Sequence, residues 1–274
     1  MNNTFAFNRF MNLLANDGKM YFRNFGISLV VFCSMPLIFW LFDLLFGTTT
    51  HIVSRYSLIF MLAILAILLV PSKVYGKANL PNEGVGFAMM PASSLEKFLS
   101  MFFYCAIVTP LITFFGTFLV DTLLSILPFG GFEEALSIFS SYSLEDTLYD
   151  EPDGKKILDV INEVSLLDFI YAYSYIGMFL WSAIYMFGNM LFKKHKAAKT
   201  FACFLGIVWL LVMFFGLIIY HNTGNIERWG LTHNSPAQVL QAFHDLMMVV
   251  AVLGVIITAL LLFFTYRKIK TQKY

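Results

Sequence analysis

This sequence has few charged residues. Of its 274 residues only 13% are Asp, Glu, Lys or Arg, which is about half of the roughly 25% found in soluble domains. Because 59% of the residues are hydrophobic and 18% are aromatic, we expect an integral membrane protein. The formal net charge is only +1, so the sequence does not predict the basic face that a nucleic-acid partner requires.

Cysteines and catalytic motifs are also scarce. Cys33, Cys105 and Cys203 each lie in an apolar run at no spacing typical of metal ligands, which favours packing residues over disulfides or zinc. The sequence contains no Gly-x-x-x-x-Gly-Lys-Ser/Thr loop, no His-Glu-x-x-His motif and no Gly-x-Ser-x-Gly elbow. We therefore expect no enzyme activity, metal or cofactor in this chain, and any ATP-driven work must come from another subunit.

Six apolar runs are each long enough to cross a bilayer, which takes about 20 residues. They cover residues 26–46, 56–75, 98–127, 166–192, 200–220 and 246–266. Before the first run, Phe10, Leu13 and Leu14 lie at helical spacing beside a cationic, polar side. This pattern predicts an interfacial amphipathic helix over 1–25, lying on the inner membrane surface before the chain turns in. The expected fold is an all-α membrane protein with six transmembrane helices in a single transmembrane domain.

The distribution of positive charge predicts the orientation. With both termini in the cytoplasm, 14 of the 18 Lys and Arg residues fall on the inner side, and only Arg55, Lys155, Lys156 and Arg228 fall outside. This is a strong positive-inside signal. It places the loop 79–97 in the cytosol.

A long acidic loop, residues 128–165, is predicted on the outer side. Between residues 129 and 165 it carries nine acidic residues against Lys155 and Lys156. Such runs are usually solvated surface. An alternative function follows from the same loop, in which the chain is a membrane sensor or accessory subunit that binds a cation or a cationic peptide there.

The loop 79–97 leads into the third span through a helix-start signal. Ser93 or Ser94 can cap a helix that continues through Leu95 and Phe98, and Pro91 can occupy a first helical turn. Two interpretations remain open. The segment is either a docking site on which a soluble partner pushes, or a turn followed by a membrane-surface helix.

Polar residues recur every four positions along the third span. Thr109, Thr113, Thr117 and Asp121 form this row, and residues four apart are neighbours on a helix. The row can line a translocation path or the cleft between two permease copies. It can equally be a packing feature, since small residues allow close helix contact and Thr bonds its own backbone.

Histidines near the outer ends of the last spans suggest another alternative, a metal-dependent intramembrane enzyme. Its residues would be Asp168, His221, His233 and His244. Their spacing is irregular, and such residues commonly serve as interfacial polar anchors.

The surface helix, the six spans and the loop before the third span together resemble the permease subunits of export-type ATP-binding-cassette transporters. The residues that match the loop motif are Met90, Pro91, Ala92, Ser93, Ser94, Glu96, Lys97 and Phe98. In that family a Leu-Pro-x-Ser-like segment with a following Lys forms a coupling helix on the ATPase, and Met90 here replaces the usual leucine. The acidic loop before the fourth span is longer than the family leads us to expect.

The resemblance implies partners and roles. Met90, Pro91, Ser93, Ser94, Glu96 and Lys97 would couple the chain to a separate ATPase subunit. A second permease copy or a paralogue would complete the path, and membrane lipid would surround both. The chain would act as the permease of an exporter for a hydrophobic or amphipathic substrate in the cell membrane of a bacterium.

Overall fold

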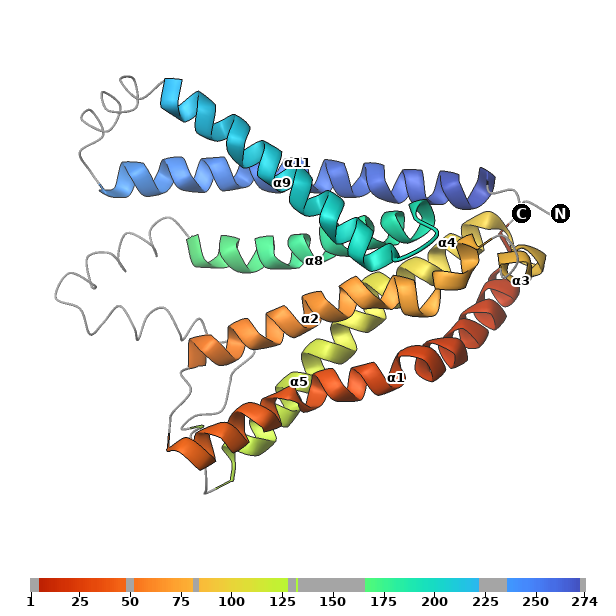
Figure 1. The fold of residues 1–274 in the computed structure, drawn as a ribbon, viewed down its shortest axis with the longest axis horizontal. Coiled ribbons are helices and arrows are strands. Elements are labelled where there is room, and N and C mark those ends of the chain that lie inside the picture. Colours follow the sequence, from red (N-terminus) through yellow and green to blue (C-terminus); the bar gives the residue numbers. More distant parts are fainter. Residues whose placement is uncertain are drawn as a thin grey trace. The chain divides into compact units, whose positions relative to one another are not determined.

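The computed structural model describes residues 5–47, 52–80, 84–127, 132, 166–221 and 236–271. Within these residues every element of secondary structure is a helix (Figure 1). This confirms the all-α class that the composition and the apolar runs predict.

The chain divides into two units. Unit 1 comprises Met1–Ser140, Met178–Ala197 and Thr258–Tyr274, and unit 2 comprises Ser141–Gly177 and Ala198–Ile257. The coupling loop and the Thr row predicted from the sequence both belong to unit 1.

Helix α1 is one continuous helix, Phe7–Phe46, of 40 residues. The expected turn between an interfacial helix and a first span is therefore absent. Residues 20–30 contain no proline, and the single glycine there, Gly26, does not end a helix. At about 1.5 Å per residue α1 is about 60 Å long, twice the thickness of a hydrocarbon core of about 30 Å. It ends at Gly47, whose φ of 64° is the left-handed conformation that glycine adopts freely.

The next elements of unit 1 surround the predicted loop. They are α2 (Ile52–Val74), the short 3-10 turn η1 (Gly76–Asn79), α3 (Gly84–Met89), α4 (Ser94–Phe102), the π-helical turn η2 (Phe103–Val108) and α5 (Thr109–Ser125). Helices α4, η2 and α5 follow one another without a break and form a 32-residue rod, Ser94–Ser125 (Figure 1). We call this the third rod.

The π-helical turn in the third rod has a local cause. Pro110 has no N–H to bond the carbonyl one turn earlier, so the regular helical pattern cannot continue through it. The Thr109 N–H and the Thr109 hydroxyl both donate to the carbonyl of Tyr104, five residues back, the hydroxyl at 2.7 Å. One wider turn thereby satisfies the backbone without ending the rod.

Three more long helices complete the described chain: α8 (Leu166–Leu191), α9 (Lys196–His221) and α11 (Pro236–Thr271). The segments of α8 and α11 that belong to unit 1 help to close its core. That core also contains Tyr21 and Phe25 of α1, Val70 of α2 and Met101 of α4, with Met186 of α8. In unit 2 the described side chains of α9 are mostly exposed hydrophobic residues, as expected for a helix surrounded by lipid.

Five described helices are long and apolar enough to cross a membrane. They are Phe7–Phe46, Ser54–Val74, Ser94–Ser125, Lys196–Phe214 and Met247–Thr271. The span predicted at 166–192 coincides with α8, whose shorter segment Ile176–Leu191 is apolar. The chain is thus a membrane-embedded, multi-pass protein, and its sixth span stays a prediction.

Candidate functional site

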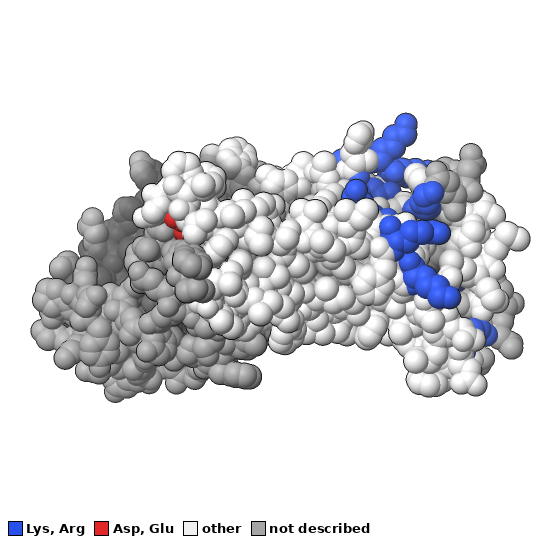
Figure 2. Space-filling view, turned by 90° about the horizontal axis from the view of Figure 1, so that it is seen from below, with Lys and Arg blue, Asp and Glu red and all other residues white. Residues whose placement is uncertain are grey.

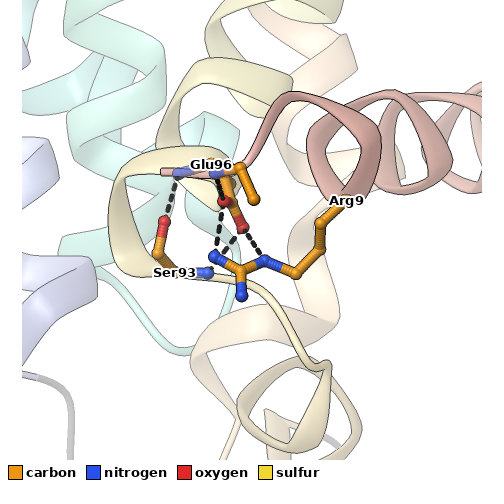
Figure 3. A network of polar contacts seen from close by, with 4 residues as sticks. Arg9, Ser93 and Glu96 are labelled. Atoms are coloured by element: carbon orange, nitrogen blue, oxygen red, sulfur yellow. Dashed lines mark hydrogen bonds and ion pairs between the residues drawn. The ribbon is translucent and has the colours of Figure 1, made fainter. Parts of the chain in front are cut away.

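Helix α4 begins with a capping box. The Ser93 hydroxyl accepts a hydrogen bond from the Glu96 N–H at 3.3 Å, and the Glu96 carboxylate accepts one from the Ser93 N–H at 2.8 Å (Figure 3). This confirms the predicted cap and assigns it to Ser93 rather than Ser94. Pro91 lies in the bend before the cap and not in a first helical turn, because the capping box fixes the first helical residue three positions later.

The Glu96 carboxylate also joins α4 to the beginning of α1. It accepts hydrogen bonds from the Ala6 N–H at 2.8 Å and from Arg9 Nε at 2.8 Å, and Arg9 Nη2 lies 2.7 Å from its other oxygen (Figure 3). Glu96 is 0% exposed. A buried carboxylate with a bidentate guanidinium and two backbone donors is well satisfied. The place where the start of α1 meets the start of α4, which we call the corner, therefore has a fixed geometry.

Lys97 holds the short helix α3 against α4. Its Nζ donates to the carbonyl of Phe87 at 2.6 Å and lies 5.2 Å from the centroid of the Phe87 ring. Lys97 is only 5% exposed. Glu96 and Lys97, which the family resemblance assigns to contact with an ATPase, therefore use their charges to build the corner itself.

Apolar side chains around this corner face outward instead. Met89 is 78% exposed and Val85 is 40% exposed, both on α3, and Pro91 in the following bend is exposed. We call Val85, Met89 and Pro91 the docking surface. Sequence reasoning missed Val85 and Met89, although their spacing of four residues was a usable signal for one helical face.

Further hydrogen bonds tie α1 to the third rod beyond this corner. The Asp17 carboxylate accepts from the Ser100 hydroxyl at 2.6 Å and from the Tyr75 hydroxyl at 3.2 Å. The Tyr104 hydroxyl donates to the carbonyl of Leu14 at 2.8 Å. The hydroxyls of Tyr21 and Thr109 share a bond of 3.0 Å.

The turn η1 is fixed to the end of α8 in the same unit. The Asn79 side-chain amide donates to the carbonyls of Met190 at 2.7 Å and Phe192 at 3.2 Å. Lys196 Nζ donates to the carbonyl of Gly76. The turn η1 is therefore bonded both to the end of α8 and to the first residue of α9.

The predicted Thr row is buried inside unit 1. Thr109, Thr113, Thr117 and Asp121 are each at most 1% exposed. The Thr113 hydroxyl donates to the Thr109 carbonyl at 2.8 Å, and the Thr117 hydroxyl donates to the Thr113 carbonyl at 2.6 Å. Such bonds to the helix's own backbone are what the packing interpretation predicts. Lining of a path, or an interface with a second permease, stays a prediction for these residues.

The alternative sites fall largely outside the described part of the chain. His233 and the acidic loop, apart from Phe132, belong to residues that the structure does not describe, as do the side chains of Asp168, His221 and His244. Among the described side chains no group of three His, Cys, Asp or Glu residues could hold a metal ion.

The long apolar helices define a class, the membrane-embedded helical proteins that cross the bilayer several times. No protein-family model matches the chain, and no curated protein or solved structure matches it either.

Proposed function

We propose that this chain is the permease subunit of an ATP-driven exporter, in which a separate ATP-binding-cassette ATPase supplies the energy and a hydrophobic or amphipathic substrate is moved outward. The observation that carries the proposal is the docking surface. Exposed Met89 and Val85 lie on a six-residue helix that is bonded through Lys97 to the start of the third rod. Methionine is enriched at protein interfaces relative to the rest of the surface, so we take Met89 as the main anchor.

The hydrogen bonds of the corner suggest how force is transmitted. A push on α3 reaches α4 through the bond from Lys97 to Phe87, and it reaches α1 through Arg9 and Glu96. Because the pairs Asp17–Ser100 and Tyr21–Thr109 join α1 to the third rod farther along, the two helices would move as one body. A change in their tilt would open a path between this chain and a second permease copy.

The proposal includes an orientation in the membrane. We place the docking surface and both termini in the cytoplasm of a bacterial cell, with α8 as the fourth of six spans. The positive-inside count supports this placement. Figure 2 adds that the visible Lys and Arg side chains gather in one band and are not spread along the surface.

Inspection of the neighbouring genes, followed by co-purification with an ATP-binding-cassette ATPase encoded there, tests the proposal. We expect the wild-type chain to retain that ATPase and Met89→Gln to lose it by about ten-fold, the effect of removing one interface anchor worth about 1.4 kcal/mol. Met11→Gln is the matched control, because Met11 is an exposed methionine of α1 that does not belong to the docking surface. Absence of any co-purified ATPase, or equal retention by the two variants, would contradict the proposal.

A second variant separates docking from transmission. Arg9→Gln removes the guanidinium from Glu96 and leaves the docking surface intact. We expect this variant to retain the ATPase while the permease-dependent stimulation of ATP hydrolysis in nanodiscs falls. Stimulation equal to that of the wild type would rule out transmission through Arg9 and Glu96.

A further inference from the structure

An apolar groove lies between α4 and the last turns of α11, both of which belong to unit 1. Its volume is about 450 Å³, within the range of about 300–1,000 Å³ typical of ligand pockets. Phe98 and Phe102 line one wall, and Leu262, Phe263 and Tyr266 line the other. The rings of Phe98 and Tyr266 meet edge to face, with 5.9 Å between their centroids.

Two cationic side chains lie just beyond the groove, toward the C-terminal end of α11. Arg267 and Lys270 come four and seven residues after Phe263, so helix geometry places them on the same face as the groove wall. Both side chains are exposed. Tyr266 lies at the transition, as tyrosine commonly does where a span meets the lipid headgroups.

The position of the groove in the candidate spans limits what can fill it. Its walls belong to the spans Ser94–Ser125 and Met247–Thr271, which are surrounded by acyl chains in a membrane. An occupant must therefore match an apolar slot at one end and two cations at the other. An anionic phospholipid has both features.

A second copy of this chain fits these features less well. A stable protein interface takes about 20–30 residues from each side, whereas eight residues line the groove. A two-fold pairing here would also bring the same cations, Arg267 and Lys270, toward their own copies.

We propose that this groove binds one acyl chain of an anionic phospholipid, whose phosphate lies against Arg267 and Lys270. The site lies between α4 and the described part of α11 and involves no residue of the docking surface. Its test does not depend on the exporter proposal, because the test measures lipid labelling and needs no ATPase.

Photo-crosslinking of the full chain in vesicles tests the site. The probes are phosphatidylglycerol and phosphatidylcholine that each carry a diazirine in one acyl chain, and mass spectrometry locates the labelled residues. We expect phosphatidylglycerol to label residues 98–102 and 262–266 more strongly than phosphatidylcholine does. The double variant Arg267→Gln/Lys270→Gln should lower the phosphatidylglycerol labelling by about ten-fold or more, since each cation near an anionic lipid contributes about a five-fold effect.

The matched control is Lys193→Gln/Lys194→Gln, which removes two exposed cations from the loop after α8. Its labelling should equal that of the wild type, and melting temperatures in phosphatidylcholine will show that both double variants fold. Equal labelling by the two lipids, or an equal loss in both double variants, would overturn the proposal. Absence of labelling by both lipids at residues 98–102 and 262–266 would also overturn it, because the groove would then hold no acyl chain.

Discussion

Arg55 on α2 and Asp121 on α5 form an ion pair that is almost completely buried. Arg55 Nε lies 3.1 Å from Asp121 Oδ1, a second nitrogen contacts Oδ2, and the two side chains are 3% and 2% exposed. The guanidinium also lies 4.1 Å from the centroid of the Phe132 ring. Two carboxylates of the third rod therefore form ion pairs with other helices. Glu96 at its start pairs with Arg9, which is 30% exposed, and Asp121 near its finish pairs with the buried Arg55.

Breaking the Arg55–Asp121 pair should destabilise the protein strongly. We expect Arg55→Met to lower the free energy of unfolding by about 3–5 kcal/mol, because Asp121 would keep a buried charge without its guanidinium. The double variant Arg55→Met/Asp121→Leu should recover most of that loss, since neither charge is then left alone. Denaturant titration in mixed micelles measures both values, and a double variant no more stable than Arg55→Met would contradict this account.

The capping box predicts different effects for two adjacent serines. Ser93→Ala removes the acceptor for the Glu96 N–H and should lower stability by about 1 kcal/mol. Ser94→Ala should change stability by less than about 0.5 kcal/mol, because Ser94 is the first helical residue and not the cap. Thermal unfolding of the two variants side by side measures the difference, and equal effects would show that Ser93 does not act as the cap.

Close packing of α1 against α5 makes Gly116 intolerant of a side chain. A Cβ at this position would lie 2.5 Å from Cys33 Sγ, so Gly116→Ala should destabilise by about 1–3 kcal/mol. Cys33→Ala removes the clashing sulfur and should restore much of the loss in the double variant. The control is Gly26→Ala, where no atom lies within 4 Å, and there the better helix propensity should stabilise by about 0.5–1 kcal/mol. Loss of stability at both glycines alike would argue against the clash.

Two buried tyrosines should respond differently to loss of the hydroxyl. Tyr75 donates to the Asp17 carboxylate, so Tyr75→Phe should lower stability by about 1.5–3 kcal/mol, the contribution of a hydrogen bond to a charged group. The Tyr185 hydroxyl is buried and has no hydrogen-bond partner among the described residues, so Tyr185→Phe should be neutral or stabilising. Unfolding titrations of the two variants under one condition give the comparison, and a loss at Tyr185 equal to that at Tyr75 would refute it.

Several elements of this structure follow from the sequence because their causes are local. Low charge and long apolar runs predict membrane helices, and the described chain is all-helical with five candidate spans. A serine cap at Ser93 or Ser94 predicts a helix start, and α4 begins directly after Ser93. The four-residue spacing of Thr109, Thr113 and Thr117 predicts a single face, which the structure buries.

The sequence by itself thus determined that the chain is helical and embedded in lipid, since hydrophobicity, helix spacing and capping act over a few residues. Only the tertiary structure decided which charges meet. Arg9 pairs with Glu96 across 87 positions, and Arg55 pairs with Asp121 across 66. Such partners depend on how whole helices pack, so Glu96 and Lys97 turned inward while Val85 and Met89 stayed on the surface.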